Sequence, residues 1–149
     1  NIFRSSEHWI IKLQNLVKKE MEKINILLVD DDDTGNFVTK KFFSSNKLNV
    51  QLKVLENGKE AVDYFDSLIT NFPDLILLDI NMPLMDGFEF LEWYDNNGFT
   101  GKTKIAMFSS SIREDDKERA FPFTDVIEYI EKPLTKSKFK ILSDKLTDS

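Results

Sequence analysis

Short apolar runs alternate with polar, helix-period stretches along most of the chain, and this alternation constrains the fold more than any other feature. Strict alternation of strand-like and helix-like segments, with largely apolar strands, predicts a doubly wound α/β fold: a five-stranded parallel sheet with helices on both faces. The predicted strands are residues 24–29, 50–55, 75–78, 104–108 and 126–130, and the predicted helices lie near 34–46, 58–70, 86–97, 112–120 and 134–146.

Composition excludes several kinds of chemistry. The 149 residues correspond to about one domain. The chain has no cysteine, which excludes a disulfide framework, thiolate metal sites and cysteine nucleophiles. With His8 as the only histidine, a histidine-based metal site or a Ser-His-Asp triad is nearly impossible.

The net charge of −6 is unevenly distributed. Residues 1–23 carry +2, whereas the remainder carries −8 because 15 basic residues stand against 23 acidic ones. An acidic body disfavours direct nucleic-acid binding. No apolar run approaches the ~20 residues of a membrane span, and nothing resembles a cleavable signal peptide. We therefore expect no membrane association and a cytoplasmic location.

Polar side chains follow four of the predicted strands. Asp30 and Asp31 come after the first strand, Asp79 after the third, Ser109 after the fourth and Lys132 after the fifth. In such sheets, ligands bind outside the carboxyl ends of the strands. Clustered carboxylates repel one another unless a cation lies among them, and their hard oxygens favour Mg²⁺. A nearby hydroxyl and ammonium suit an anionic group beside that metal, so the pattern indicates phosphoryl-transfer chemistry.

Over residues 22–148 the chain resembles a receiver domain of the two-component response-regulator family. The resemblance depends on five elements in the expected order: Leu27-Leu28-Val29-Asp30-Asp31, Leu77-Leu78-Asp79-Ile80-Asn81-Met82-Pro83-Leu84-Met85-Asp86-Gly87, Ser109, Tyr129 and Lys132-Pro133. It implies the flavodoxin-like receiver fold, with residues 22–149 as the receiver domain. It also implies a phosphorylation-controlled switch that is not an enzyme acting on a separate substrate.

The resemblance implies a role for each carboxylate. Asp79 would accept a phosphoryl group from a histidine kinase or a phosphotransfer protein. Asp31 and Asp79 would ligate Mg²⁺ through their carboxylates, and Asn81 through its backbone carbonyl. Asp30 would hold the water shell of the metal.

The remaining site residues would serve the phosphoryl group. Lys132 would pair with Asp79 and later with the phosphoryl oxygens, and a cis peptide bond before Pro133 would aim its side chain. Ser109 would donate a hydrogen bond to a phosphoryl oxygen. Tyr129 would swing inward as the switch, although a packing role on its strand is nearly as well supported.

Two local assignments concern the flanks of the site. The neighbouring serines Ser110 and Ser111 are alternatives to Ser109, which the strand register favours. Asp33 is expected to cap a helix that begins at Thr34, because aspartate is favoured at helix N-caps.

Residues 1–21 lie outside the resemblance and form an amphipathic N-terminal extension. Apolar residues recur at helical spacing, and Ser6 is a candidate N-cap. Three interpretations stand equal: a native helix that packs on its own domain or a neighbouring subunit, a linker or partner-binding helix, or residues foreign to the natural protein. The third interpretation arises because Met21 is a plausible first residue of the natural protein.

Two rival functions remain open. Asp30-Asp31-Asp32-Asp33-Thr34 fits the D-x-D-x-T signature of haloacid-dehalogenase-like phosphatases, in which Asp30 would be the nucleophile. The chain could alternatively be an inert receiver-like binding module. For a working receiver we expect output through a downstream protein target that binds residues 112–120, 126–130 and 134–146, and a monomer or weak homodimer.

Overall fold

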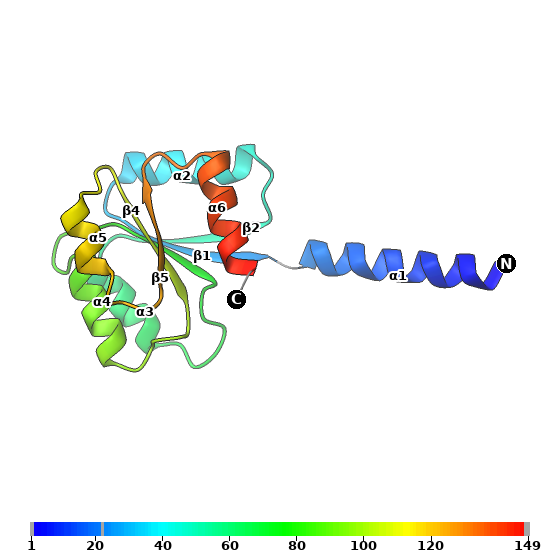
Figure 1. The fold of residues 1–149 in the computed structure, drawn as a ribbon, viewed down its shortest axis with the longest axis horizontal. Coiled ribbons are helices and arrows are strands. Elements are labelled where there is room, and N and C mark those ends of the chain that lie inside the picture. Colours follow the sequence, from blue (N-terminus) through cyan, green and yellow to red (C-terminus); the bar gives the residue numbers. More distant parts are fainter. Residues whose placement is uncertain (1, 22, 148–149) are drawn as a thin grey trace.

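The computed structural model describes residues 2–21 and 23–147, with side chains for residues 6–15 and 23–147. Helices and strands alternate along the chain, as predicted (Figure 1). The strands are β1 (Ile24–Val29), β2 (Val50–Leu55), β3 (Leu75–Leu78), β4 (Lys104–Ser109) and β5 (Val126–Glu131). The helices are α1 (Ile2–Met21), α2 (Asp33–Ser45), α3 (Gly58–Asp66), α4 (Gly87–Asn96), α5 (Glu114–Ala120) and α6 (Lys136–Thr147).

All five strands are parallel and lie in the order β2-β1-β3-β4-β5. The strand order reverses direction between β1 and β3, and this is the point where ligands bind in doubly wound sheets. The predicted fold class is therefore confirmed, and the sheet places the ends of β1 and β3 side by side.

Each face of the sheet buries its own hydrophobic core. On one face, side chains such as Leu27 and Val29 pack with residues of α3, α4 and α5. On the other face, Ile26 and Leu28 pack with residues of α2 and α6. Alternate residues of β1 thus enter opposite cores, and all four are nearly inaccessible to water. Burial of such a side chain stabilises the fold by about 1.5–3 kcal/mol, which explains why the central runs Ile26–Val29 and Leu75–Leu78 are continuously apolar.

Several predicted boundaries differ from the structure. The helix expected over 58–70 ends at Asp66. The Ser67 N–H is shared between the Asp63 and Tyr64 carbonyls, and the Leu68 N–H donates to the Phe65 carbonyl in a tighter turn. The helices expected from 112 and 134 begin two residues later. The expected cap at Asp33 is wrong, since Asp33 is the first residue of α2 and Asp32 occupies the N-cap position without a side-chain capping bond.

Helix α1 projects away from the sheet in Figure 1. It begins at Ile2, so Ser6 lies within the helix and is not its N-cap, contrary to the sequence prediction. Side chains 6–15 are all exposed, including Trp9 at 65%. Leu16, Val17 and Met21 are further apolar residues at helical spacing in this segment, and their side chains lie outside the described residues. Among the described residues, none of the helices combines the length and hydropathy needed to cross a membrane.

Candidate functional site

Three carboxylates meet where β1 and β3 end. The register pairs Val29 with Leu78, so the residues that follow, Asp30 and Asp79, are neighbours across the two strands. Asp31 completes the group, and one oxygen of each of the three carboxylates lies within 4.8 Å of the others. Asp30 is 1% exposed and Asp79 is 7% exposed, whereas Asp31 is exposed. The predicted acidic cluster is thus present, with two buried members and one that faces solvent.

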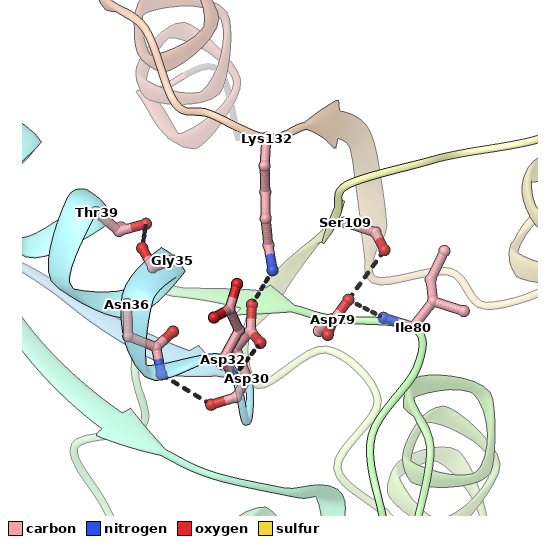
Figure 2. A network of polar contacts seen from close by, with 9 residues as sticks. All are labelled: Asp30, Asp32, Gly35, Asn36, Thr39, Asp79, Ile80, Ser109 and Lys132. Atoms are coloured by element: carbon pink, nitrogen blue, oxygen red, sulfur yellow. Dashed lines mark hydrogen bonds and ion pairs between the residues drawn. The ribbon is translucent and has the colours of Figure 1, made fainter.

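Asp79 is held by two donors that converge on one oxygen (Figure 2). The Ser109 hydroxyl donates to Asp79 Oδ1 at 2.9 Å, and the Ile80 N–H donates to the same oxygen at 2.8 Å. Burial, followed by the negative charge of Asp30, raises the pKa of Asp79 from 3.8 to about 6, although Lys132 and these two donors act in the opposite direction. The folded protein therefore disfavours the ionised form of Asp79, because Lys132 and the two donors do not offset burial and the Asp30 charge.

Lys132 reaches the same cluster from the end of β5. Its backbone N–H donates to the Ser109 carbonyl at 2.9 Å, and its Nζ forms a short salt bridge with Asp30 Oδ2. The family resemblance implies that Lys132 pairs with Asp79. In the structure Lys132 Nζ pairs with Asp30 Oδ2 instead, while Ser109 and Ile80 donate to Asp79 Oδ1. The cis peptide bond expected before Pro133 is present.

The loop from Asp79 to Gly87 is shaped by its glycine. A side-chain Cβ at Gly87 would lie 2.3 Å from the Asp79 carbonyl oxygen, a distance that no real side chain tolerates. Gly87 also donates its N–H to the Ile80 carbonyl at 2.9 Å, and Asp86 caps α4 through a capping box with Glu89. This close packing fixes the backbone at Asp79 and Ile80. Asn81 lies within the loop and is exposed.

Tyr129 lies on the α5 side of β5. Its hydroxyl donates to the Lys117 carbonyl of α5 at 3.3 Å, and its ring packs against the core shared by α3, α4 and α5. Burial, with a contribution from the Glu128 charge, raises the pKa of Tyr129. The structure thus places this side chain in contact with α5, and the inward movement expected of it stays a prediction.

The profile of the response regulator receiver domain family matches residues 26–142. The chain belongs to this family. This receiver is 34% identical over 135 residues to two-component response regulator 24 of Arabidopsis thaliana, and the match covers 91% of this chain and 90% of the plant protein.

Solved structures agree with the assignment. A two-component response regulator from Cytophaga hutchinsonii superimposes with a TM-score of 0.78 and 28% identity, over 86% of this receiver and all of that chain. The Mn²⁺-bound form of response regulator Rcp1 superimposes with a TM-score of 0.65 and 26% identity, over 80% of this receiver and 89% of that chain.

The carboxylate cluster of this receiver fits a divalent cation. Three hard oxygen ligands lie close together, and the two buried carboxylates, Asp30 and Asp79, face the one ammonium group of Lys132, which leaves an imbalance of negative charge. A cation among these oxygens would remove that imbalance. The cluster is typical of a receiver Mg²⁺ site.

Sequence reasoning missed Asn36, a residue of α2 that contacts the backbone of Asp30. Its Nδ2 donates to the Asp30 carbonyl at 2.9 Å, and it is 5% exposed. Asn36 shares the buried face of α2 with Thr39 and Phe43, so a polar residue at an inward helical position was the available indication. By holding the Asp30 carbonyl, Asn36 helps to fix the backbone at the end of β1.

Proposed function

We propose that this chain is a phosphorylation-controlled signalling switch that accepts a phosphoryl group on Asp79. The donor would be a phosphohistidine of a histidine kinase or a phosphotransfer protein. A bond forms between an Asp79 carboxylate oxygen and phosphorus, the phosphorus–nitrogen bond breaks, and the histidine nitrogen keeps its electron pair. The arrangement that carries the proposal is the cluster of Asp30, Asp31 and Asp79 with Lys132 and Ser109 beside it.

Mg²⁺ would be held by the carboxylates of Asp31 and Asp79 and by the Asn81 carbonyl, with Asp30 holding its water shell. When bound, the metal supplies positive charge that neutralises the oxygens of the transferred group. Asp79 supplies the accepting oxygen. Its raised pKa of about 6 still leaves it ionised at neutral pH and therefore nucleophilic.

Lys132 and Ser109 would stabilise the phosphoryl group once it is attached. Ser109 already donates to Asp79 Oδ1, so its hydroxyl needs only a small movement to reach an oxygen of the attached group. Lys132 would exchange its Asp30 partner for a phosphoryl oxygen. Both groups oppose the added negative charge and therefore favour the phosphorylated state.

The output would be a change in the surface formed by residues 112–120, 126–130 and 134–146. Movement of Ser109 toward the phosphoryl group would let Tyr129 leave its hydrogen bond with the Lys117 carbonyl and turn inward. A downstream protein would bind the altered surface. We propose a cytoplasmic location and a monomer or weak homodimer, with no direct contact to nucleic acid or membrane.

The test is phosphorylation by acetyl phosphate with Mg²⁺, followed by intact-protein mass spectrometry. Wild-type protein gains the mass of a phosphoryl group, Asp79→Asn does not, and the matched variant Asp33→Asn, which alters an exposed carboxylate of α2, does. Labelling that survives Asp79→Asn but disappears in Asp30→Asn would support the haloacid-dehalogenase-like phosphatase. A wild-type protein that is neither labelled nor stabilised by Mg²⁺ would instead be an inert binding module.

A further inference from the structure

A hollow lies at the edge of the sheet opposite the carboxylate site. It has a volume of about 740 Å³ and is lined by the residues where β1, β2 and β4 begin, by those that precede β3 and β5, and by the end of α6. Its size falls within the range of small-molecule sites in proteins. The proposed phosphoryl chemistry uses none of its lining residues.

Apolar and basic groups dominate the lining. Leu48, Phe72 and Phe139 contribute apolar surface from three separate segments. Lys23, Lys102 and Lys104 also line the hollow, and among the described residues none of these ammonium groups forms a salt bridge.

Lys102 also interacts with one of the apolar walls. Its Nζ lies 5.7 Å from the centre of the Phe72 ring, which places a positive charge beside this apolar side chain. Positive charge and apolar surface are therefore adjacent.

The two acidic residues of the lining are occupied by internal donors. Asp125 accepts hydrogen bonds from the Tyr94 hydroxyl at 2.6 Å and from the Gly101 N–H at 2.7 Å. Asp74 accepts from the Asn25 N–H at 2.8 Å. One oxygen of each carboxylate, Oδ2, is thus engaged with the protein. The three ammonium groups keep their donors available to a bound molecule, and they outnumber the two carboxylates.

We propose that this hollow binds a small amphiphilic anion, meaning an acidic headgroup attached to an aromatic or aliphatic body. The headgroup pairs with the lysine ammonium groups, mainly those of Lys102 and Lys104. The body lies against Phe72, Leu48 and Phe139. The lysine ammonium groups favour an anion over a neutral or cationic ligand. The neighbouring apolar side chains favour an anion with an apolar body over a small, fully hydrated ion.

The probe pair for the test is 8-anilinonaphthalene-1-sulfonate and its uncharged relative N-phenyl-1-naphthylamine, titrated into the full chain. The sulfonate is expected to bind, with amide NMR shifts centred on residues 101–104 and 72–74. The double variant Lys102→Glu/Lys104→Glu is expected to weaken sulfonate binding about tenfold or more, a loss of at least about 1.4 kcal/mol. The matched variant Lys40→Glu/Lys59→Glu, which reverses two exposed lysines outside the lining, is expected to bind as wild type does.

Three results would overturn the proposal. The first is equal sulfonate affinity in the two double variants. The second is equally tight binding of the uncharged relative, which would remove the role of charge. The third is a set of NMR shifts centred on the exposed apolar residues of α1 instead of the hollow. Circular dichroism of each variant confirms that it is folded before binding is compared.

Discussion

Replacing Asp79 with asparagine is expected to stabilise the metal-free protein, although it removes the proposed phosphoryl acceptor. Burial and the Asp30 charge raise the pKa of Asp79 from 3.8 to about 6, so the folded state is penalised whenever this carboxylate is ionised. That difference corresponds to about 3 kcal/mol. The neutral amide of asparagine accepts weaker hydrogen bonds from Ser109 and Ile80, and this loss reduces the gain in stability by about 1 kcal/mol. The expected net gain for Asp79→Asn at pH 8 is about 2 kcal/mol.

The direction of the pKa shift determines how the stability contributed by Asp79 changes with pH. Below pH 3.8 the carboxyl group is protonated in both the folded and the unfolded state, and its charge penalises neither. Between pH 3.8 and about 6 the folded state holds the proton more tightly, so the stability contributed by Asp79 falls as pH rises. Above about pH 6 the penalty is constant. The advantage of Asp79→Asn should therefore grow between pH 4 and 6 and then level off.

The assay is urea denaturation in the presence of a metal chelator, followed by tryptophan fluorescence and repeated across pH 4 to 8. Asp31→Asn serves as the matched control, because it removes an exposed carboxylate of the same cluster and should change stability by no more than about 0.5 kcal/mol. A variant Asp79→Asn that is no more stable than wild type at pH 8 would refute the electrostatic penalty assigned to Asp79. An equal stability advantage of Asp79→Asn at pH 4 and at pH 8 would refute it as well.

Three further predictions concern the same end of the sheet. Gly87→Ala should destabilise the protein by about 1–3 kcal/mol in urea denaturation, because the new Cβ would overlap the Asp79 carbonyl; unchanged stability would contradict the close approach. Lys132→Met should cost about 3 kcal/mol by leaving buried Asp30 unpaired, and adding Asp30→Asn should restore most of that loss. Mg²⁺ at about 100 times its dissociation constant should stabilise wild type by about 2.7 kcal/mol, and chelation should reverse the effect; Asp79→Asn should respond less at the same concentration.

The sequence predicted the fold because its local patterns and the tertiary arrangement agree. A run such as Leu75–Leu78, with every side chain apolar, is stable only between two covered faces, and the structure buries all four residues completely. The carboxylates of the site were predictable for a related reason. Parallel strands end at one edge, so Asp30 and Asp79 had to approach each other once β1 and β3 were neighbours.

Helix ends were less predictable, because competing interactions of similar strength determine them. Asp32 and Asp33 have the same side chain, and chain packing near Asp30 decides which one occupies the N-cap position. The early end of α3 at Asp66 likewise depends on where the following loop turns toward the core. Local propensity alone does not separate these alternatives.

By itself, the sequence determined the fold class, the edge of the sheet that carries the acidic cluster, and the residue types available there. Only the tertiary structure decided that Lys132 pairs with Asp30, that Asn36 supports the Asp30 backbone, and that a basic and apolar hollow lies at the opposite edge. The physical reason is the difference in length scale between chain spacing and polar contacts. Spacing along the chain specifies which side chains reach an edge, whereas hydrogen bonds and charge pairs depend on differences of about 1 Å that arise only when helices and strands pack together.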